Sequence, residues 1–355
     1  MKVKYAIIGF GGIAENRVAK EGFGCDKSRF NGLKKAVLVA ATDMNPARQA
    51  AAEALGLKWY ENSDAILADK SIDAVYIATN NASHAKLAIA ALKAGKHVIV
   101  EKPAATSVAD AKAMDKLAKA KNLSLTVDHM MVNNAWNIAG AKLLQAGKLG
   151  NVNDSCFHME FAYGYDPAEA ATWRCSKIEE MGGPIGDVAS HCFYVAEYMF
   201  GKKIAKVAAV YYPKVMKIKA EDGAYIKFFF EDGTQGSVNA SFSELRGGLA
   251  GTLTNLGYEI YGDKAILRGY GTLFQLSGYD DEPVRIRLEL DDGKKTTAVA
   301  PGKIQNIYQA LIEGHAASVQ TGKFLTAGGA IHNLALCAAA HKSAQNGGKI
   351  IVVKD

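Results

Sequence analysis

The sequence has few cysteines, no long apolar run and no concentration of positive charge, and each shortage excludes a class of protein. Its five cysteines are odd in number and form no CxxC pair, so we expect free thiols in a reducing cytosol rather than a disulfide framework or a zinc knuckle. A membrane helix needs about 18 consecutive apolar residues, and no stretch is that long. The apolar run before Gly9 is too short for a secretory signal. These shortages favour a cytoplasmic protein without a membrane partner.

Positive charge is spread thinly, because the net charge of +6 comes from lysines and arginines that stand in ones and twos. Proteins that follow a phosphate backbone gather such residues in a stripe or patch, so we expect no nucleic-acid partner. The composition is otherwise that of an ordinary globular protein, and 355 residues suffice for two domains.

A glycine-rich turn lies near the amino terminus, between a strand-like run at 4–8 and a helix. It reads Gly9-Phe10-Gly11-Gly12-Ile13-Ala14, which is the GxGxxA spacing. Gly9 allows the tight turn, Gly11 lets the backbone approach a pyrophosphate, and the helix amides that follow attract phosphate. The pattern predicts a dinucleotide site at Gly9, Gly11, Gly12 and Ile13.

A second strand, at 36–41, ends in Thr42-Asp43. A carboxylate here can hydrogen-bond the adenosine ribose hydroxyls, so Asp43 favours NAD over NADP. The gap from the glycines is longer than the usual roughly 20 residues, and we attribute the excess to an inserted loop at 22–32 that is rich in glycine and polar residues. Asp43 can also cap the turn before Asn45-Pro46, and the two roles are compatible.

Strand-like and helical runs alternate through the first third of the chain, which predicts βαβ units in a doubly wound parallel sheet over residues 1–127. After Asp128 the pattern changes to strands with turn signals at Asp232-Gly233, Gly262-Asp263 and Asp292-Gly293, which predict antiparallel hairpins. Residues 284–290 alternate with period two. Residues 128–355 are therefore expected to form an α+β domain, whose last helices (304–320, 329–345) or last strand (349–353) can pack back on the first.

Charged residues follow the strand at 97–100, where the chain reads Glu101-Lys102-Pro103. Ligands bind at the carboxyl ends of the strands in a doubly wound sheet, so Glu101 and Lys102 are placed as functional groups.

A second constellation lies on a helix that starts near Pro184 and ends at Gly201. Asp187 and His191 are four residues apart and share one helical face. Alone, the pair is more typical of a helix-end charge and a buried structural histidine. Together with Lys102 at a cofactor cleft, it supplies the base, cation and orienting carboxylate that alcohol oxidation needs.

These motifs, in this order, resemble the glucose-fructose oxidoreductase, inositol dehydrogenase and MocA (Gfo/Idh/MocA) family over nearly the whole chain. The resemblance implies that Lys102 and His191, oriented by Asp187, handle the proton of a substrate hydroxyl while hydride passes to or from nicotinamide. It also implies a second domain with a large, mostly antiparallel open sheet that pairs subunits into a homodimer or homotetramer. The residues implied to line the nicotinamide side are Thr79, Asn80, His84 and Glu101, although the family commonly has proline at Asn80.

The chain departs from the family at Val132, where many members carry arginine. His129 and Asn133 can take over that substrate contact, although an interdomain structural role is at least as well supported for either. Trp173 offers a flat face for a sugar ring and Arg174 can bind hydroxyls or a carboxylate; a packed tryptophan and a surface arginine are the alternatives. No metal is predicted, because His191 and Cys192 diverge on a helix.

The sequence therefore predicts an NAD-dependent oxidoreductase that acts on a hydroxyl of a small-molecule sugar, polyol or glycoside. Two alternatives use the same residues. One is a redox-neutral glycosidase or epimerase that retains NAD, and the other is a non-catalytic, NAD-sensing regulatory protein.

Overall fold

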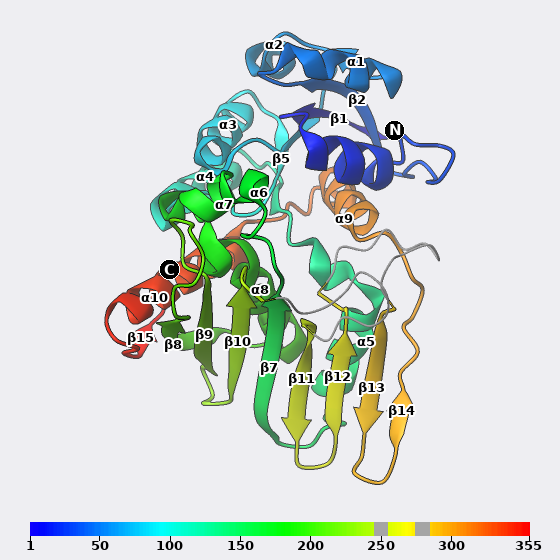
Figure 1. Cartoon of the computed structure of the whole chain (residues 1–355). Coiled ribbons are helices and arrows are strands. Elements are labelled where there is room, and N and C mark those ends of the chain that lie inside the picture. Colours follow the sequence, from blue (N-terminus) through cyan, green and yellow to red (C-terminus); the bar gives the residue numbers. More distant parts are fainter. Residues whose placement is uncertain (245–254, 274–284) are drawn as a thin grey trace. The chain divides into compact units, whose positions relative to one another are not determined.

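The computed structural model describes residues 1–244, 255–273 and 285–355, which Figure 1 draws coloured along the sequence. They divide into two compact units by their internal contacts. The first unit comprises Met1–Met130 and Asn306–Ile331, and the second comprises Met131–Gln305 and His332–Asp355.

The first unit is built on a parallel sheet, as predicted. Within the described residues its strands have the order β3-β2-β1-β4-β5-β6, and every pair is parallel. The strands are mostly buried apolar runs, as expected for a sheet with both faces covered. Their bounds are β1 (Val3–Ile8), β2 (Ala36–Thr42), β3 (Lys58–Trp59), β4 (Ala74–Ile77), β5 (His97–Val100) and β6 (Leu125–Val127).

Side-chain caps fix where the main helices of this unit begin. The Asn80 side chain accepts from Ser83 N at the start of α3, and Ser107 accepts from Asp110 N at the start of α4. The helical segments are η1 (Ala14–Gly22), η2 (Pro46–Arg48), α1 (Gln49–Ala54), α2 (Ser63–Ala68), α3 (Asn81–Lys93), α4 (Val108–Ala120) and, from far along the chain, α9 (Ile307–Thr321).

The inserted loop at 22–32 lies against α9. The Gln309 amide of α9 donates to Asn31 O at 3.0 Å and to Glu21 O at 3.1 Å. Next to it, Tyr5 of β1 and His315 of α9 are hydrogen-bonded at 2.6 Å. Burial lowers the pKa of His315 to about 3, so this imidazole is neutral. The loop and α9 thus form one side of the first unit.

The second unit is built on a larger, mostly antiparallel sheet, and this expectation is also confirmed. Within the described residues the order is β14-β13-β12-β11-β7-β10-β9-β8-β15, in which β7 and β10 run parallel and the other neighbours antiparallel. The bounds are β7 (Val152–Glu160), β8 (Ile204–Tyr211), β9 (Gly223–Phe230), β10 (Gln235–Ser241), β11 (Leu256–Gly262), β12 (Ile266–Tyr270), β13 (Arg287–Asp291), β14 (Thr296–Ala298) and β15 (Ile351–Val352).

The hairpin turns fall where the sequence places them, with Gly233 and Gly293 at φ of 87° and 79°. The predicted strand at 284–290 starts later, at Arg287, and Val284 lies outside the described residues. The remaining helical segments are η3 (Met130–Asn133), α5 (Ala135–Gln145), α6 (Pro167–Ala170), α7 (Trp173–Ser176), η4 (Ile178–Glu180), η5 (Ile185–Ala189), α8 (Ser190–Phe200) and α10 (Gly328–Gln345).

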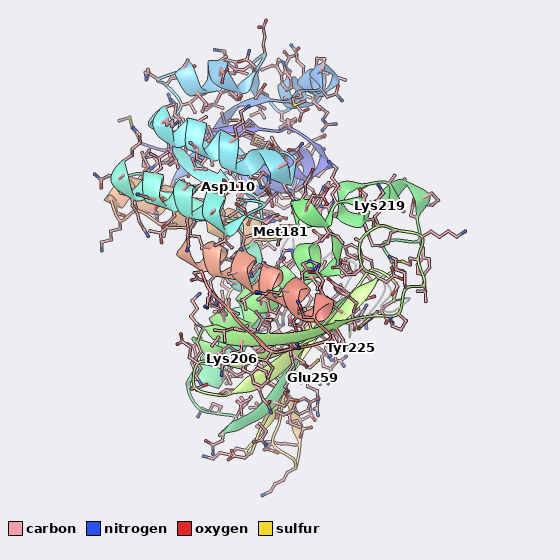
Figure 2. The ribbon with its side chains drawn as sticks, turned by 90° about the vertical axis from the view of Figure 1, so that its left-hand side faces the viewer. Asp110, Met181, Lys206, Lys219, Tyr225 and Glu259 are labelled. Carbon is pink, nitrogen blue, oxygen red and sulfur yellow. The ribbon has the colours of Figure 1, made fainter. Side chains whose placement is uncertain are left out.

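The two faces of this sheet differ in character. Helices α5 and α8 pack on one face, where Phe157, Phe228 and Tyr258 are buried and their rings meet. Strand alternation and register place Lys206, Tyr225 and Glu259 together on the opposite face (Figure 2). Tyr225 on that face is 53% exposed, so the second face carries apolar surface toward solvent.

Candidate active site

The glycine-rich turn of the first unit has the shape that a dinucleotide requires. Gly9 has φ of 93°, its N–H donates to Thr42 O at 2.9 Å, and a Cβ added to it would lie 2.7 Å from Ala78 O. Only glycine fits there. A Cβ added to Gly11 or Gly12 would meet no atom within 4 Å, and Ile13 beside them is 43% exposed. The turn therefore offers open backbone to a pyrophosphate.

Two side chains of opposite charge lie beside this turn. Asp43 follows β2, and its Oδ1 accepts from Asn45 N at 2.8 Å, so the turn-capping role is present. Arg48 donates to Phe10 O at 2.8 Å and forms an ion pair with Glu15. The sequence pattern did not identify Arg48, because no motif marks it. An arginine near an NAD(P) ribose is the feature that accommodates a 2′-phosphate.

His84 joins the loop after β4 to the loop after β5. Its Nδ1 lies 2.8 Å from Pro103 O and its Nε2 lies 3.2 Å from Thr79 O, and the ring is fully buried. Thr79 itself bonds the Ser83 hydroxyl at 2.7 Å, and Asn80 caps α3. His84 thus ties the Pro103 carbonyl, next to Lys102, to the loop after β4.

Glu101 is held by a hydrogen-bonded cluster at the same edge of the sheet. The Tyr76 hydroxyl lies 2.9 Å from Glu101 Oε1 and 2.5 Å from Asp128 Oδ2. Burial raises the pKa of Asp128 well above its usual range, and the charge of Glu101 raises it further. His129, the next residue, is partly buried, and its backbone N–H donates to Val127 O at 2.8 Å. The sequence did not single out Tyr76 or Asp128, because Tyr76 fits as part of a buried strand and Asp128 as the residue after one.

In the second unit, Asp187 lies next to Arg174 and Arg174 lies next to Trp173, and these two, Arg174 and Trp173, are among the three residues predicted to bind substrate. Arg174 Nε lies 3.2 Å from Asp187 Oδ2, and the guanidinium lies 4.7 Å from the centroid of the Trp173 ring. The charge of Asp187 raises the pKa of Arg174. One helical turn on, His191 Nδ1 lies 2.7 Å from the Tyr194 hydroxyl. Asp187, His191 and Tyr194 are each less than a tenth exposed.

A buried carboxyl that sequence reasoning missed supports the start of this helix. Glu221 Oε1 accepts from Ile185 N at 2.9 Å, and a Cβ added to Gly183 would lie 2.4 Å from Glu221 Oε2. Glu221 therefore satisfies a helix amide and fixes the glycine turn that leads to Asp187. Burial raises its pKa to about 7, although the hydrogen bond from Ile185 opposes this rise.

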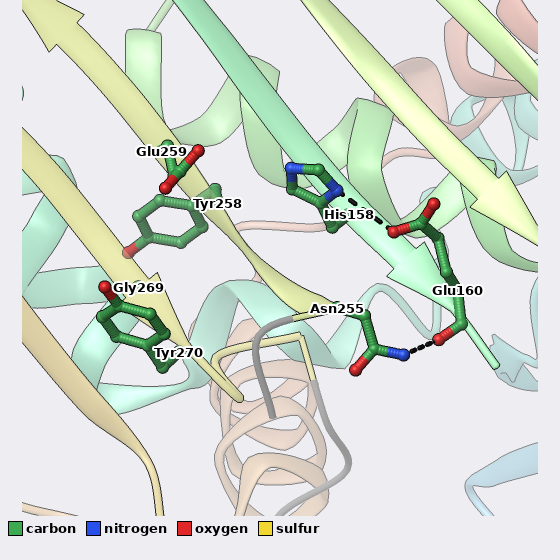
Figure 3. A pocket seen from close by; sticks show the side chains of 7 residues that line it. All are labelled: His158, Glu160, Asn255, Tyr258, Glu259, Gly269 and Tyr270. Atoms are coloured by element: carbon green, nitrogen blue, oxygen red, sulfur yellow. Dashed lines mark hydrogen bonds and ion pairs between the residues drawn. The ribbon is translucent and has the colours of Figure 1, made fainter. Parts of the chain in front are cut away.

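The sheet of the second unit carries a polar cavity of about 380 Å³ (Figure 3). His158 pairs across β7 and β11 with Gly257, where a Cβ would lie 1.9 Å from Gly269 O. Burial lowers the pKa of His158, but hydrogen bonds to Cys156 and Glu160 outweigh it and raise the pKa to about 10. The cavity thus holds an imidazolium. Its lining residues are His158, Glu160, Asn255, Tyr258, Glu259, Gly269 and Tyr270.

Within the described residues, no group of three or more histidine, cysteine, aspartate or glutamate side chains is arranged to hold a metal ion. None of the helices in that part of the chain is both long and apolar enough to cross a membrane.

Comparison with known proteins identifies the family. Residues 3–129 match the model described as an oxidoreductase family with an NAD-binding Rossmann fold, and residues 139–268 match the GFO/IDH/MocA C-terminal domain. The chain belongs to the Gfo/Idh/MocA oxidoreductase family. The expected resemblance is confirmed, and the protein is an oxidoreductase.

Individual relatives agree with this assignment. The 1,5-anhydro-D-fructose reductase of Ensifer adhaerens is 26% identical over 265 residues, 73% of this chain and 74% of the relative. The aldose-aldose oxidoreductase of Caulobacter crescentus, complexed with glycerol, has a TM-score of 0.84 at 22% identity and covers 99% of this chain and 100% of its own. A levoglucosan dehydrogenase in complex with NADH and levoglucosan has a TM-score of 0.81 at 20% identity, with full coverage of both chains. At these identities the structural matches show the fold alone.

Glu221 generates a testable pH dependence. Its pKa is about 7 in the folded chain and near 4.5 otherwise, so the folded state holds a proton that the unfolded state releases between these values. This contribution to stability is complete below about pH 4.5 and is lost by about pH 7, up to roughly 3 kcal/mol. Glu221→Gln keeps an acceptor for Ile185 N and removes the titration, so its unfolding free energy should fall less over this range.

Urea unfolding at several pH values between 4.5 and 8 measures this difference. Glu179→Gln, at an exposed position of the same unit, is the matched control and should follow the native protein. Parallel pH curves for Glu221→Gln and the native protein would show that Glu221 is ionised throughout.

Proposed function

We propose that this oxidoreductase is NAD-dependent and moves hydride between nicotinamide and a hydroxyl carbon of a sugar, polyol or glycoside. The observation that carries the proposal is the edge of the parallel sheet, where an open glycine turn and the pair Glu101-Lys102 follow strands of one sheet. We further propose that residues 1–127 bind the dinucleotide and residues 128–355 bind the substrate and associate with other subunits. The names of the relatives support a carbohydrate substrate.

The glycine turn fits a dinucleotide, because Gly9 must be glycine and Gly11 and Gly12 leave their backbone open. NAD, when bound, supplies the nicotinamide carbon that accepts or returns the hydride. In this proposal Gly9, Gly11, Gly12 and Ile13 hold the pyrophosphate, and Thr79, Asn80, His84 and Glu101 lie on the nicotinamide side.

Proton handling is assigned to Lys102, Asp187 and His191. Lys102 supplies positive charge to stabilise a developing alkoxide. His191 exchanges the hydroxyl proton, and the Tyr194 hydroxyl, 2.7 Å from Nδ1, orients its ring. Asp187 is itself fixed by Arg174 at 3.2 Å, so its carboxylate has a defined direction.

Substrate binding is assigned to His129, Trp173 and Arg174. The Trp173 ring can stack on the apolar face of a sugar, and Arg174 offers several donors to hydroxyl oxygens. The guanidinium carbon of Arg174 lies over one face of the Trp173 ring, 4.7 Å from its centroid, and so holds the ring in a defined orientation. Partial burial of Arg174 supports this role over that of a surface arginine.

Replacing His191 tests the mechanism. His191→Asn should lower turnover by roughly 10²- to 10⁴-fold and leave the dissociation constant for NAD nearly unchanged, because only proton transfer is removed. A nicotinamide absorbance screen over sugars, polyols and glycosides measures turnover, after mass spectrometry of the cofactor carried through purification. Net NADH formation also separates a dehydrogenase from a redox-neutral enzyme.

His341→Asn provides the matched control, since His341 is a buried histidine of α10 that bonds the Tyr211 hydroxyl at 2.9 Å. The folded His341→Asn variant should retain its activity. Undiminished turnover of His191→Asn would remove His191 from the mechanism.

The choice of NAD over NADP rests on Asp43 and is tested by Asp43→Ser. A carboxylate repels a ribose 2′-phosphate, so its removal should shift the ratio of the two dissociation constants toward NADP by about tenfold or more, which corresponds to about 1.4 kcal/mol. Fluorescence titration with NADH and NADPH measures both constants. Arg48→Gln is the companion variant, and it should weaken NADPH binding more than NADH binding. A native protein that prefers NADPH would contradict the assignment.

We also propose that the exposed face of the large sheet pairs subunits into a homodimer or homotetramer. Tyr225 and Val210 are register neighbours on that face, 53% and 52% exposed, and apolar surface of this kind is typical of an interface. Tyr225→Lys should shift the mass measured by light scattering toward the monomer. Tyr165→Lys, at a 52% exposed tyrosine outside the sheet, should not. A native protein that is monomeric at all concentrations would contradict the proposal.

A further inference from the structure

Three side chains with acidic hydrogens meet at the carboxyl edge of the parallel sheet. Tyr76 lies on β4, Glu101 directly follows β5, and Asp128 directly follows β6. These strands are neighbours in the sheet, so their ends lie side by side. Tyr76 and Asp128 have no exposed surface, and Glu101 is partly exposed.

The distances in this cluster indicate how many hydrogens it holds. The Tyr76 hydroxyl lies 2.9 Å from Glu101 Oε1 and 2.5 Å from Asp128 Oδ2, and both are hydrogen-bond distances between oxygens. A phenol has one hydrogen, and an ionised carboxylate has none. One phenol hydrogen makes only one well-aligned bond, so a protonated carboxyl group is the natural source of a hydrogen for the other contact.

Asp128 is the better holder of that second hydrogen. It is fully buried, and its Oδ1 accepts no hydrogen bond within the described part of the chain. An ionised carboxylate in such a place lacks the solvation that its charge requires. Glu101 is instead partly exposed and adjoins the positive charge of Lys102.

We propose that Asp128 is a neutral acid at physiological pH that donates to the Tyr76 oxygen, while Tyr76 donates to Glu101. The cluster then carries a single negative charge, on Glu101. Tyr76 and Asp128 are positioning residues that orient the Glu101 carboxylate next to Lys102. The role of this orientation in turnover rests on the proposed function, whereas the protonation state does not.

Other groups that face the cluster agree with this distribution of charge. Burial raises the pKa of Glu101, and the hydrogen bond from Tyr76 and the charge of Lys102 oppose this rise and favour its ionised form. Tyr308 of α9 faces Tyr76, and burial raises the pKa of Tyr76 far above neutrality, so this phenol keeps its hydrogen. The charge of Glu101 then favours the protonated form of Asp128.

The test is the pH dependence of unfolding, measured without substrate or cofactor. If Asp128 keeps its proton in the folded state, the folded chain binds one proton more than the unfolded chain above about pH 4. The unfolding equilibrium constant should then rise up to tenfold per pH unit from this group. Asp128→Asn carries an amide in its place, so its constant should rise less steeply between pH 5 and 8.

Asp115→Asn is the matched control in the same unit. Asp115 is also buried, but it accepts from Ala327 N at 2.8 Å and pairs with Lys119 at 2.5 Å. Its replacement removes a paired carboxylate, so it should lower stability without flattening the rise. Equal slopes for Asp128→Asn and the native protein would overturn the proposal.

A second measurement needs no variant. Native protein labelled with ¹³C-carboxyl aspartate should show, at pH 7, an infrared carbonyl band of a protonated carboxylic acid. Absence of this band overturns the proposal even where Asp128→Asn fails to fold. Neither result depends on turnover, so failure here leaves the proposed function standing. With a suitable substrate found, Asp128→Asn should retain most activity and Tyr76→Phe should shift its pH profile, which loss of packing alone does not do.

Discussion

Charged groups at the ends of buried strands must find partners within the protein, and much of the candidate site follows from this constraint. Where β5 ends, the chain leaves an apolar interior and presents Glu101 and Lys102 within two residues. Burial without a partner is costly for such groups. In the structure, Tyr76 is hydrogen-bonded to both Glu101 and Asp128, and His84 is hydrogen-bonded to the Pro103 carbonyl. Tyr76 and Asp128, which offset the cost of burying the Glu101 charge, also fix the direction of the Glu101 side chain.

The second unit solves the same problem at a helix start. Asp187 is placed near the amino end of η5, where Ile185 N is satisfied by Glu221 and Asp187 itself is paired with Arg174. Glu221 in turn fills the space that Gly183 leaves. Gly183, Glu221 and Arg174 therefore together fix the start of this helix. His191 lies one turn further along the same helix, so its position depends on them.

Periodicity and motif spacing predicted the parts of the fold in which the signal is local. The glycine turn, the strands around it and the hairpins with Asp-Gly turns lie where the sequence places them, because each depends on residues within a few positions. The β13 strand was placed early because alternation alone does not show where pairing begins. The two-residue β3 has no periodicity to detect.

The supporting residues were not predictable, since their partners are far away in sequence. Glu221 is 36 residues from Ile185, and Tyr76 is 52 residues from Asp128. A strand tyrosine such as Tyr76, or a loop glutamate such as Glu221, has the same neighbours in sequence whether or not it supports a site. Motif spacing found the groups proposed to act, and three-dimensional pairing was needed to find the groups that hold them.

The first unit is built from two separate segments of the chain, and helix α9 belongs to the later one. His315 of this helix bonds Tyr5 of the first strand, and Gln309 bonds the loop at 22–32. During synthesis, the ribosome releases β1 through β6 long before α9 exists. The first unit therefore lacks one of its covering helices until nearly all of the second unit has emerged. The two units then complete their folding late and close together in time.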